Sequence, residues 1–177
     1  MGTNGPQPPA DDLRIRPAIP EDGDLVTAVL TASYGALWRG HYANSDLEAV
    51  LPLVTIAQPR LLASHRFFLV FAGDQAAGCG GWSEDVPGKP GHVVEGTGHI
   101  RHFGVDPAHL RKGIGHMLYR ACRDQAVQAG IVRLEAWSSL QAVPFYQRLG
   151  FRIIEPFAIE MGNGVRLASM RMSTDLH

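Results

Sequence analysis

The sequence has little cysteine, no long apolar run and almost no net charge. Only Cys79 and Cys122 occur, too few for a disulfide framework, so a reduced, cytoplasmic chain is predicted. No apolar run approaches the roughly 20 residues that cross a membrane, which argues against a membrane span and a membrane partner. The formal net charge is -1, which gives no electrostatic reason to expect nucleic acid as a partner.

The start of the chain also lacks features of a folded or exported segment. Residues 1–11 contain three prolines and no apolar core, so we predict a disordered tail rather than a signal peptide or a strand. The remaining residues, 12–177, show no internal repeat. With 45% hydrophobic and 19% charged residues, they are predicted to form a single domain.

What the sequence does contain is a glycine-rich turn before an amphipathic helix. The run from Arg111 to His116 opens this helix and Gly130 ends it. Its apolar positions recur at helical spacing: Ile114, Leu118, Cys122 and Ala126. Because glycine is a poor helix former, Gly113 and Gly115 favour close approach of another group to the backbone. The unpaired N–H groups and the helix dipole at this end suit a phosphate or pyrophosphate.

The same turn allows other interpretations. The two glycines can simply let the helix pack closely on a sheet, and the turn alone does not separate this from phosphate binding. A dinucleotide fingerprint fits poorly, because Leu118 stands where a third glycine is needed and no acidic residue follows at ribose-binding distance. A Walker A loop does not fit, because Lys112 precedes its glycine instead of following it.

Hydrophobic periodicity predicts alternating strands and helices along the chain. The expected strands are residues 13–18, 66–72, 75–83, 99–105, 131–137, 151–154 and 165–172. The expected helices are residues 21–34, 45–56, 111–130 and 143–149. Ser45 is expected to cap the second helix. The loop from Glu84 to Gly98 is long, which predicts either a functional lid or a mobile insertion.

Two motifs in the right order make the chain resemble the GNAT superfamily of N-acetyltransferases. Val105-Asp106-Pro107 leads into the glycine turn, which follows the family pattern Gln/Arg-x-x-Gly-x-Gly/Ala except for Leu110 at its first position. Downstream, Ala142 to Phe151 follows Ala-x-x-Phe-Tyr-x-x-x-Gly-Phe. The resemblance covers residues 12–177. It implies an α/β (α+β) GNAT fold, in which a mixed central sheet of about seven strands is flanked by helices.

The resemblance also implies acetyl-CoA as the co-substrate, with no metal. Two central strands splay apart in this family, and the acyl-CoA arm enters between the strands matched here by residues 99–105 and 131–137. The N–H group of Val105 is implied to point at the acyl carbonyl. The implied cofactor contacts are Phe103, Val105, Leu110, Arg111, Lys112, Gly113, Ile114, Gly115, His116, Ser139 and Tyr146.

Acyl transfer to an amine needs a base, a polarised carbonyl and a proton for the departing thiolate. By resemblance, Tyr146 protonates the sulfur and His99 matches a position that carries the base; aromatic packing and a structural histidine are the plainer interpretations. Strand alternation places His99, Phe103 and Val105 on one face and His102 on the other. A bulge that shifts this alternation would favour His102 as the base.

Acceptor contacts in the family come from the first two helices, their link and the loop before the base-carrying strand. These segments predict an aromatic wall, unless the side chains are ordinary packing: Tyr34, Trp38, His41, Tyr42 and Trp82. The eight histidines do not predict a metal site, because His99 and His102 are expected on opposite faces and no Cys or carboxylate completes a ligand set.

The predicted function is therefore an N-acetyltransferase that moves an acetyl group from acetyl-CoA to a primary amine by direct attack. The acceptor is a small molecule or a peptide, and a homodimer is expected by family habit. A module that binds acyl-CoA and senses or regulates without turnover is the alternative. The presence of Tyr146 favours the enzyme.

Overall fold

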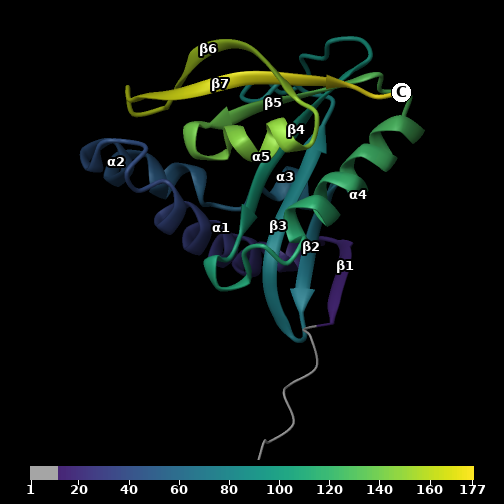
Figure 1. Ribbon diagram of the computed structural model, residues 1–177, viewed down its shortest axis with the longest axis horizontal. Coiled ribbons are helices and arrows are strands. Elements are labelled where there is room, and N and C mark those ends of the chain that lie inside the picture. The colour runs from purple at the N-terminus through teal and green to yellow at the C-terminus, as the bar shows by residue number, and fades with distance from the viewer. Residues whose placement is uncertain (1–11) are drawn as a thin grey trace, which may run out of the picture.

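The computed structural model describes residues 12–177, which form one seven-stranded sheet in the order β1-β2-β3-β4-β5-β7-β6 (Figure 1). The strands are β1 (Leu13–Pro17), β2 (Phe67–Ala72), β3 (Gln75–Ser83), β4 (Thr97–Val105), β5 (Arg133–Ser139), β6 (Arg152–Glu160) and β7 (Arg166–Asp175). The helices are α1 (Gly23–Leu37), α2 (Asn44–Val54), α3 (Pro59–Leu62), α4 (Ile114–Gln128) and α5 (Val143–Arg148). Only β4 and β5 pair in parallel. The predicted mixed sheet with flanking helices is confirmed, whereas the predicted tail, residues 1–11, lies outside the described residues.

The elements follow the predicted order, with differences at their ends. Helix α2 begins at Asn44 with Ala43 as its N-cap and no side-chain cap, so the predicted Ser45 cap is wrong. The prediction also missed the single-turn helix α3, which begins at Pro59. Strands β6 and β7 are longer than predicted because they pair with each other along most of their hairpin.

Helices α4 and α1 cover opposite faces of the sheet (Figure 1). A Cβ atom added at Gly78 of β3 would contact Ile114 of α4, whereas one added at Gly104 of β4 would contact Leu30 of α1. Both helices therefore approach strands where glycine leaves room for them. We call the two sides of the sheet the α4 face and the α1 face.

A bulge in β4 disturbs the alternation of its side chains. The register of β4 against β3 shifts within the strand, and His102 has a φ of 50°. Arg101 and His102 are neighbours in the strand, yet both side chains contact Gln58 on the α1 face. The bulge therefore places two successive side chains on one side of the sheet.

This bulge corrects the predicted faces of β4. A Cβ atom at Gly98 would contact Leu134 in the core on the α4 face, so the next side chain, His99, points toward the α1 face. Beyond the bulge, Phe103 and Val105 pack against the core on the α4 face. The prediction that Phe103 and Val105 share a face with His99 is wrong, because one extra residue reverses the alternation.

The sheet opens between β4 and β5. These strands pair only from Thr97–Arg133 to His99–Glu135, although both continue for several residues. Strand β5 meanwhile stays paired with β7 as far as Ser139. Figure 1 accordingly shows β1–β4 and β5–β7 as two arms that diverge. This pairing confirms the predicted splay. We call the region between β4 and β5 beyond the His99–Glu135 pair, where no strand pairing joins them, the gap.

The close approach of β2 and β3 gives a test of the fold. A Cβ atom at Gly81 would lie 2.5 Å from the carbonyl oxygen of Arg66 and 2.8 Å from Cα of Phe67. Because these are backbone atoms, we expect Gly81→Ala to lower the free energy of unfolding by about 1–3 kcal/mol. The control Gly35→Ala, in α1 with no atom within 4 Å, should raise it by about 0.5–1 kcal/mol. Urea unfolding measures both, and a stable Gly81→Ala protein would contradict this packing.

Candidate active site

The glycine-rich turn leads directly into the N-terminus of α4. Arg111 and Gly113 have φ angles of 62° and 83°, and Gly113 is the N-cap of the helix. The first hydrogen bond within the helix runs from the N–H of Met117 to the carbonyl of Gly113, at 3.0 Å. The N–H groups of Ile114 to His116 therefore precede it, as first-turn donors without an acceptor inside the helix. The side chains of Arg111, Lys112 and His116 are exposed beside them.

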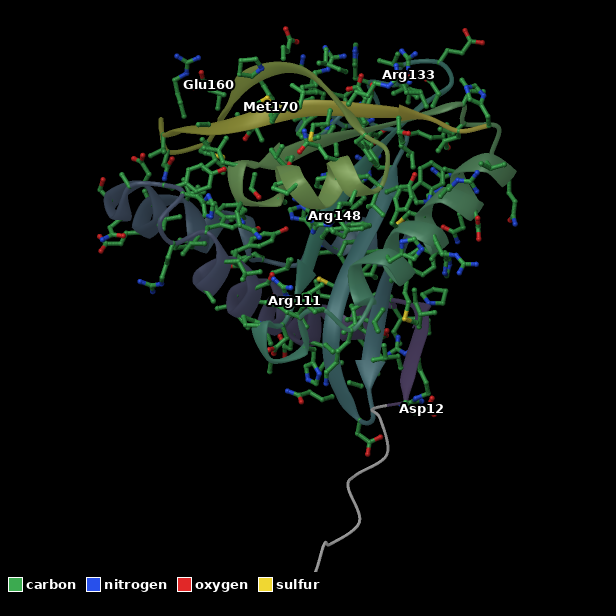
Figure 2. All side chains as sticks on the ribbon, viewed as in Figure 1. Asp12, Arg111, Arg133, Arg148, Glu160 and Met170 are labelled. Carbon is green, nitrogen blue, oxygen red and sulfur yellow. The ribbon has the colours of Figure 1, made fainter. Side chains whose placement is uncertain are left out.

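The two glycines of this turn have different purposes. A Cβ atom at Gly115 would lie 2.7 Å from the ring of Phe145 on α5, so Gly115 lets α5 pack against the start of α4. Gly113 has no atom within 4 Å and needs its positive φ for the turn. Close packing thus explains Gly115, while Gly113 shapes the backbone that presents the first-turn N–H groups. Figure 2 labels Arg111 before α4 and Arg148 on α5.

Helix α5 carries Tyr146 into the core on the α4 face. Tyr146 is 5% exposed, and its ring centroid lies 6.4 Å from that of Phe103 on β4 and 5.2 Å from that of Phe151. Burial, with a contribution from Cys122, raises the pKa of the Tyr146 hydroxyl well above its ordinary value. The hydroxyl is therefore protonated at neutral pH, which is the state that a general acid requires.

His99 lies where β4 and β5 make their last pair. It is 2% exposed, and its Nε2 lies 3.8 Å from a carboxylate oxygen of Glu135 on β5. Burial lowers the pKa of His99, and the charges of Arg101 and Arg171 lower it further. The charge of Glu135 and a backbone contact with Glu84 oppose this effect without outweighing it. The Nδ1 atom is buried without a hydrogen-bond partner among the described residues. A neutral imidazole at physiological pH can accept a proton, as a general base must.

The acidic partner of His99 was not predicted from the sequence. Glu135 accepts hydrogen bonds of 2.8 and 3.2 Å from Arg171 on β7, and Arg171 also bonds to Glu155 at 3.2 Å. Burial raises the pKa of Glu135, but the hydrogen bond and charge of Arg171 outweigh it and lower that pKa overall. Glu135 is therefore ionised beside His99. Its sequence signal was a single acidic residue between Leu134 and Ala136, in a segment that otherwise looks like core.

A bulge in β4 was expected to favour His102 as the base, and the bulge is present. However, burial and the charge of Arg101 lower the pKa of His102 to about 4. Its Nε2 lies 3.1 Å from Nε2 of Gln58, in the segment between α2 and α3. A group with so low a pKa is a weak base at neutral pH, so His99 is the better candidate.

The N–H group of Val105 is already used within the protein. It donates to Oγ of Ser33 on α1 at 3.1 Å, so in this structure it is not available to the acyl carbonyl that the resemblance assigned to it. The next N–H, of Asp106, donates to the carbonyl of Ala77 near the start of β3. Because N–H groups alternate along a strand, that of Phe103 points to the same side as that of Val105, toward the gap.

The aromatic residues predicted to form a wall do not all meet. Tyr34 and Trp38 stack with ring centroids 4.5 Å apart, Trp38 and Tyr42 lie 5.5 Å apart, and His41 is exposed beside them. Trp82 is 1% exposed in the core on the α4 face, where its Nε1 donates to a side-chain oxygen of α4 at 3.1 Å. Including Trp82 in the wall was therefore wrong, because its side chain is buried on the other face.

Two predicted cofactor residues lie at the ends of neighbouring elements. Ser139 is the N-cap of the short turn of residues 140–142, yet its side chain makes no capping hydrogen bond. Leu110 is 42% exposed before the glycine turn.

Within residues 12–177, no three His, Cys, Asp or Glu side chains are grouped to hold a metal, and Cys79 and Cys122 are free and buried. No helix of the described chain is long and apolar enough to cross a membrane.

Residues 51–174 match the model of the acetyltransferase (GNAT) domain. The chain belongs to the GNAT acetyltransferase family. Members of this family transfer acetyl groups and use acetyl-CoA, so this GNAT protein is an acyltransferase. Membership favours turnover over the alternative of a module that only binds acyl-CoA.

Solved structures share the fold of this GNAT protein at low sequence identity. A GCN5-related N-acetyltransferase from Rhodopseudomonas palustris has a TM-score of 0.75 at 20% identity, over 92% of this chain and 95% of its own. PaiA N-acetyltransferase from Thermoplasma acidophilum, solved with coenzyme A, scores 0.68 at 15% identity, over 93% and 99%. Ard1 from Thermoplasma volcanium scores 0.62 at 16% identity, over 93% and 98%. No curated protein matches the chain.

Proposed function

We propose that this GNAT protein moves the acetyl group of acetyl-CoA to a primary amine by direct attack. The observation that carries the proposal is the gap between β4 and β5, because the elements beside it supply each group that the reaction needs. The start of α4 provides anion-binding donors, and α5 provides a protonated hydroxyl at Tyr146. A neutral His99 lies at the end of the gap where β4 and β5 still pair.

In this proposal, the pyrophosphate and the pantetheine arm of acetyl-CoA bind to different elements. Its pyrophosphate accepts hydrogen bonds from the first-turn N–H groups of Ile114 to His116, with Arg111 and Lys112 adding positive charge. Its pantetheine arm lies in the gap, where the edge of β4 lacks a strand partner and can pair with the amide groups of the arm. Ser139 lies at the opposite edge of the gap, at the end of β5.

His99 acts as the general base and Tyr146 as the general acid in the proposed reaction. The neutral imidazole of His99, directly or through a water, removes a proton from the ammonium form of the acceptor, and Glu135 stabilises the resulting imidazolium. The amine attacks the thioester carbonyl, whose developing negative charge accepts a hydrogen bond from the N–H of Phe103. The carbon–sulfur bond then breaks and Tyr146 donates its proton to the CoA thiolate. The amine's remaining surplus proton passes to solvent. The proton held by the His99 imidazolium returns through solvent to the tyrosinate, so that both groups recover their starting states and one proton is released per turnover.

Titration calorimetry together with intact-protein mass spectrometry tests this proposal. The chain should bind acetyl-CoA, and its mass should stay unchanged when acetyl-CoA is added without an amine, because direct attack forms no acetyl-enzyme. Rapid acetylation of the protein that an added amine then reverses would contradict direct attack. Absence of acetyl-CoA binding would contradict the cofactor assignment.

The pair of His99 and Glu135 predicts a shift in pH dependence. The base must be unprotonated, so kcat/KM rises as pH increases through the pKa of His99, which lies below its ordinary value. The charge of Glu135 raises that pKa, so Glu135→Gln should move the acid limb of the profile to lower pH. The control Glu155→Gln removes a carboxylate that also bonds Arg171 but is not paired with His99. An acid limb that stays in place, or moves to higher pH, in Glu135→Gln would exclude His99 as the base.

A further inference from the structure

Tyr42 lies between α1 and α2 and connects this segment to the β5–β7 arm of the sheet. Its hydroxyl donates to the carbonyl of Ala168 on β7 at 2.8 Å and accepts the N–H of Leu140, just after β5, at 2.9 Å. Its ring is half-buried beside Trp38. The hydroxyl proton and a lone pair of Tyr42 are therefore both used within the protein.

Helix α1 in turn contacts β4, in the β1–β4 arm of the sheet. Ser33 Oγ accepts the N–H of Val105 at 3.1 Å, and a Cβ atom at Gly104 would lie 3.1 Å from Leu30. A continuous set of contacts therefore runs from β4 through α1 and Trp38 to Tyr42, and from there to β5 and β7. This connection crosses the gap on the α1 face.

The connection matters because the sheet itself does not hold the arms together there. Beyond His99–Glu135 no ladder joins β4 to β5. A second link lies farther out, where the exposed side chain of Asn163, in the β6–β7 turn, donates to the carbonyl of Ala49 on α2 at 3.0 Å. Figure 1 shows α2 close to this end of the β6–β7 hairpin. Leu167 of β7 also packs in the apolar cluster that α1 and α2 form. Of the two hydrogen-bonded links, that of Tyr42 is nearer to β5 and the gap.

We propose that Tyr42 is a positioning residue that sets the width of the gap between β4 and β5, and so the affinity for acetyl-CoA. The inference rests on the proposed function, because it assumes that the pantetheine arm occupies the gap. The contacts of Tyr42 are with Ala168, Leu140 and Trp38, and not with His99 or Tyr146. Its two hydrogen bonds hold the arms at one separation before the cofactor binds, so that binding energy is not spent on closing them.

Tyr42→Phe removes both hydrogen bonds and keeps the ring. We expect the KM for acetyl-CoA to rise about tenfold, as expected for a net loss of about one hydrogen bond's stabilisation, while kcat changes much less. A merely structural defect would lower the fraction of active protein, and hence kcat, without changing KM. The control Tyr119→Phe makes the same chemical change on α4, on the opposite face of the sheet, and should leave both constants unchanged.

A second pair of variants breaks the same bond from the other side. Leu140→Pro removes the N–H donor and keeps Tyr42, whereas Leu140→Ala keeps the donor and shortens the side chain. Proline fits this position, because Leu140 begins a helical turn and Ser139 before it has an extended conformation with ψ of 154°. Leu140→Pro should raise the KM for acetyl-CoA more than Leu140→Ala does. The effects of Leu140→Pro and Tyr42→Phe should also be less than additive.

Hydrogen exchange at the amide of Leu140 separates this inference from the proposed function. The amide should exchange faster in Tyr42→Phe than in the parent protein or in Tyr119→Phe, whether or not acetyl-CoA binds. If the parent protein binds acetyl-CoA and Tyr42→Phe has the same KM, the positioning role is overturned. If the parent protein does not bind acetyl-CoA, the proposed function fails, and with it the role of Tyr42 in affinity. Unchanged exchange would overturn the connection itself.

Discussion

Replacing Tyr146 by phenylalanine should lower kcat by about 100-fold to 10,000-fold and leave the KM for acetyl-CoA nearly unchanged. The hydroxyl of Tyr146 is buried and protonated, and it is the group on α5 that can supply a proton to the departing thiolate. Phenylalanine keeps the ring contacts with Phe103 and Phe151, so the fold and the gap should persist. Steady-state release of free thiol at saturating acetyl-CoA measures the change.

A matched control separates loss of the acid from loss of a buried hydroxyl. Tyr119 is also buried in the core on the α4 face, and its ring centroid lies 5.7 Å from that of Phe151. Tyr119→Phe should therefore keep its kcat. An unaltered kcat in Tyr146→Phe would remove Tyr146 from the mechanism, and equal losses in both variants would point to packing instead of proton transfer.

A negative charge at the start of α4 should weaken acetyl-CoA binding by about tenfold to a hundredfold. His116 is exposed in the first turn of the helix, where the proposed pyrophosphate accepts backbone hydrogen bonds. An aspartate there would repel the phosphates and compete for the same N–H groups, and loss of one charge-assisted contact costs about 1.5–3 kcal/mol. Calorimetric titration of His116→Asp with acetyl-CoA measures the loss.

The same substitution has an opposite effect on stability, which makes the test specific. An acidic residue in the first turn is favourable for a helix, so His116→Asp should unfold at equal or higher urea concentration than the parent protein. His116→Asn, which is isosteric with the aspartate but uncharged, should bind acetyl-CoA nearly as well as the parent. Unchanged affinity in His116→Asp would exclude the start of α4 as the pyrophosphate site.

The elements of this fold could be predicted from local patterns, because each pattern has a local cause. The apolar positions of α4 are buried as its helical spacing predicts, and its glycine turn lies where the helix begins. The splay between β4 and β5 could be predicted only from the family resemblance, because no local sequence pattern shows where two strands separate. Strand β4 marks the limit of the alternation rule, since the positive φ at His102 depends on how β3 and β4 pair and not on the composition of β4.

The site was less predictable because its partners come from distant parts of the chain. Glu135 meets His99 and Arg171 only when β4, β5 and β7 are neighbours, and Ser33 reaches Val105 only when α1 packs on β4. Nothing in the sequence near Ser33 distinguishes it from other polar helix residues. Trp82 shows the converse error, because an aromatic residue beside a predicted loop was assigned to substrate although pairing of its strand buries it.

The most direct test of the proposed acetyl transfer is the release of free thiol from acetyl-CoA with a panel of amines, amino acids, aminoglycosides and peptides as acceptors. We predict release that depends on one class of acceptor, with formation of the acetylated amine in equal amount. We also predict that the release falls sharply in Tyr146→Phe. A protein that binds acetyl-CoA but releases no thiol above background with any acceptor would contradict the proposed acetyl transfer to an amine.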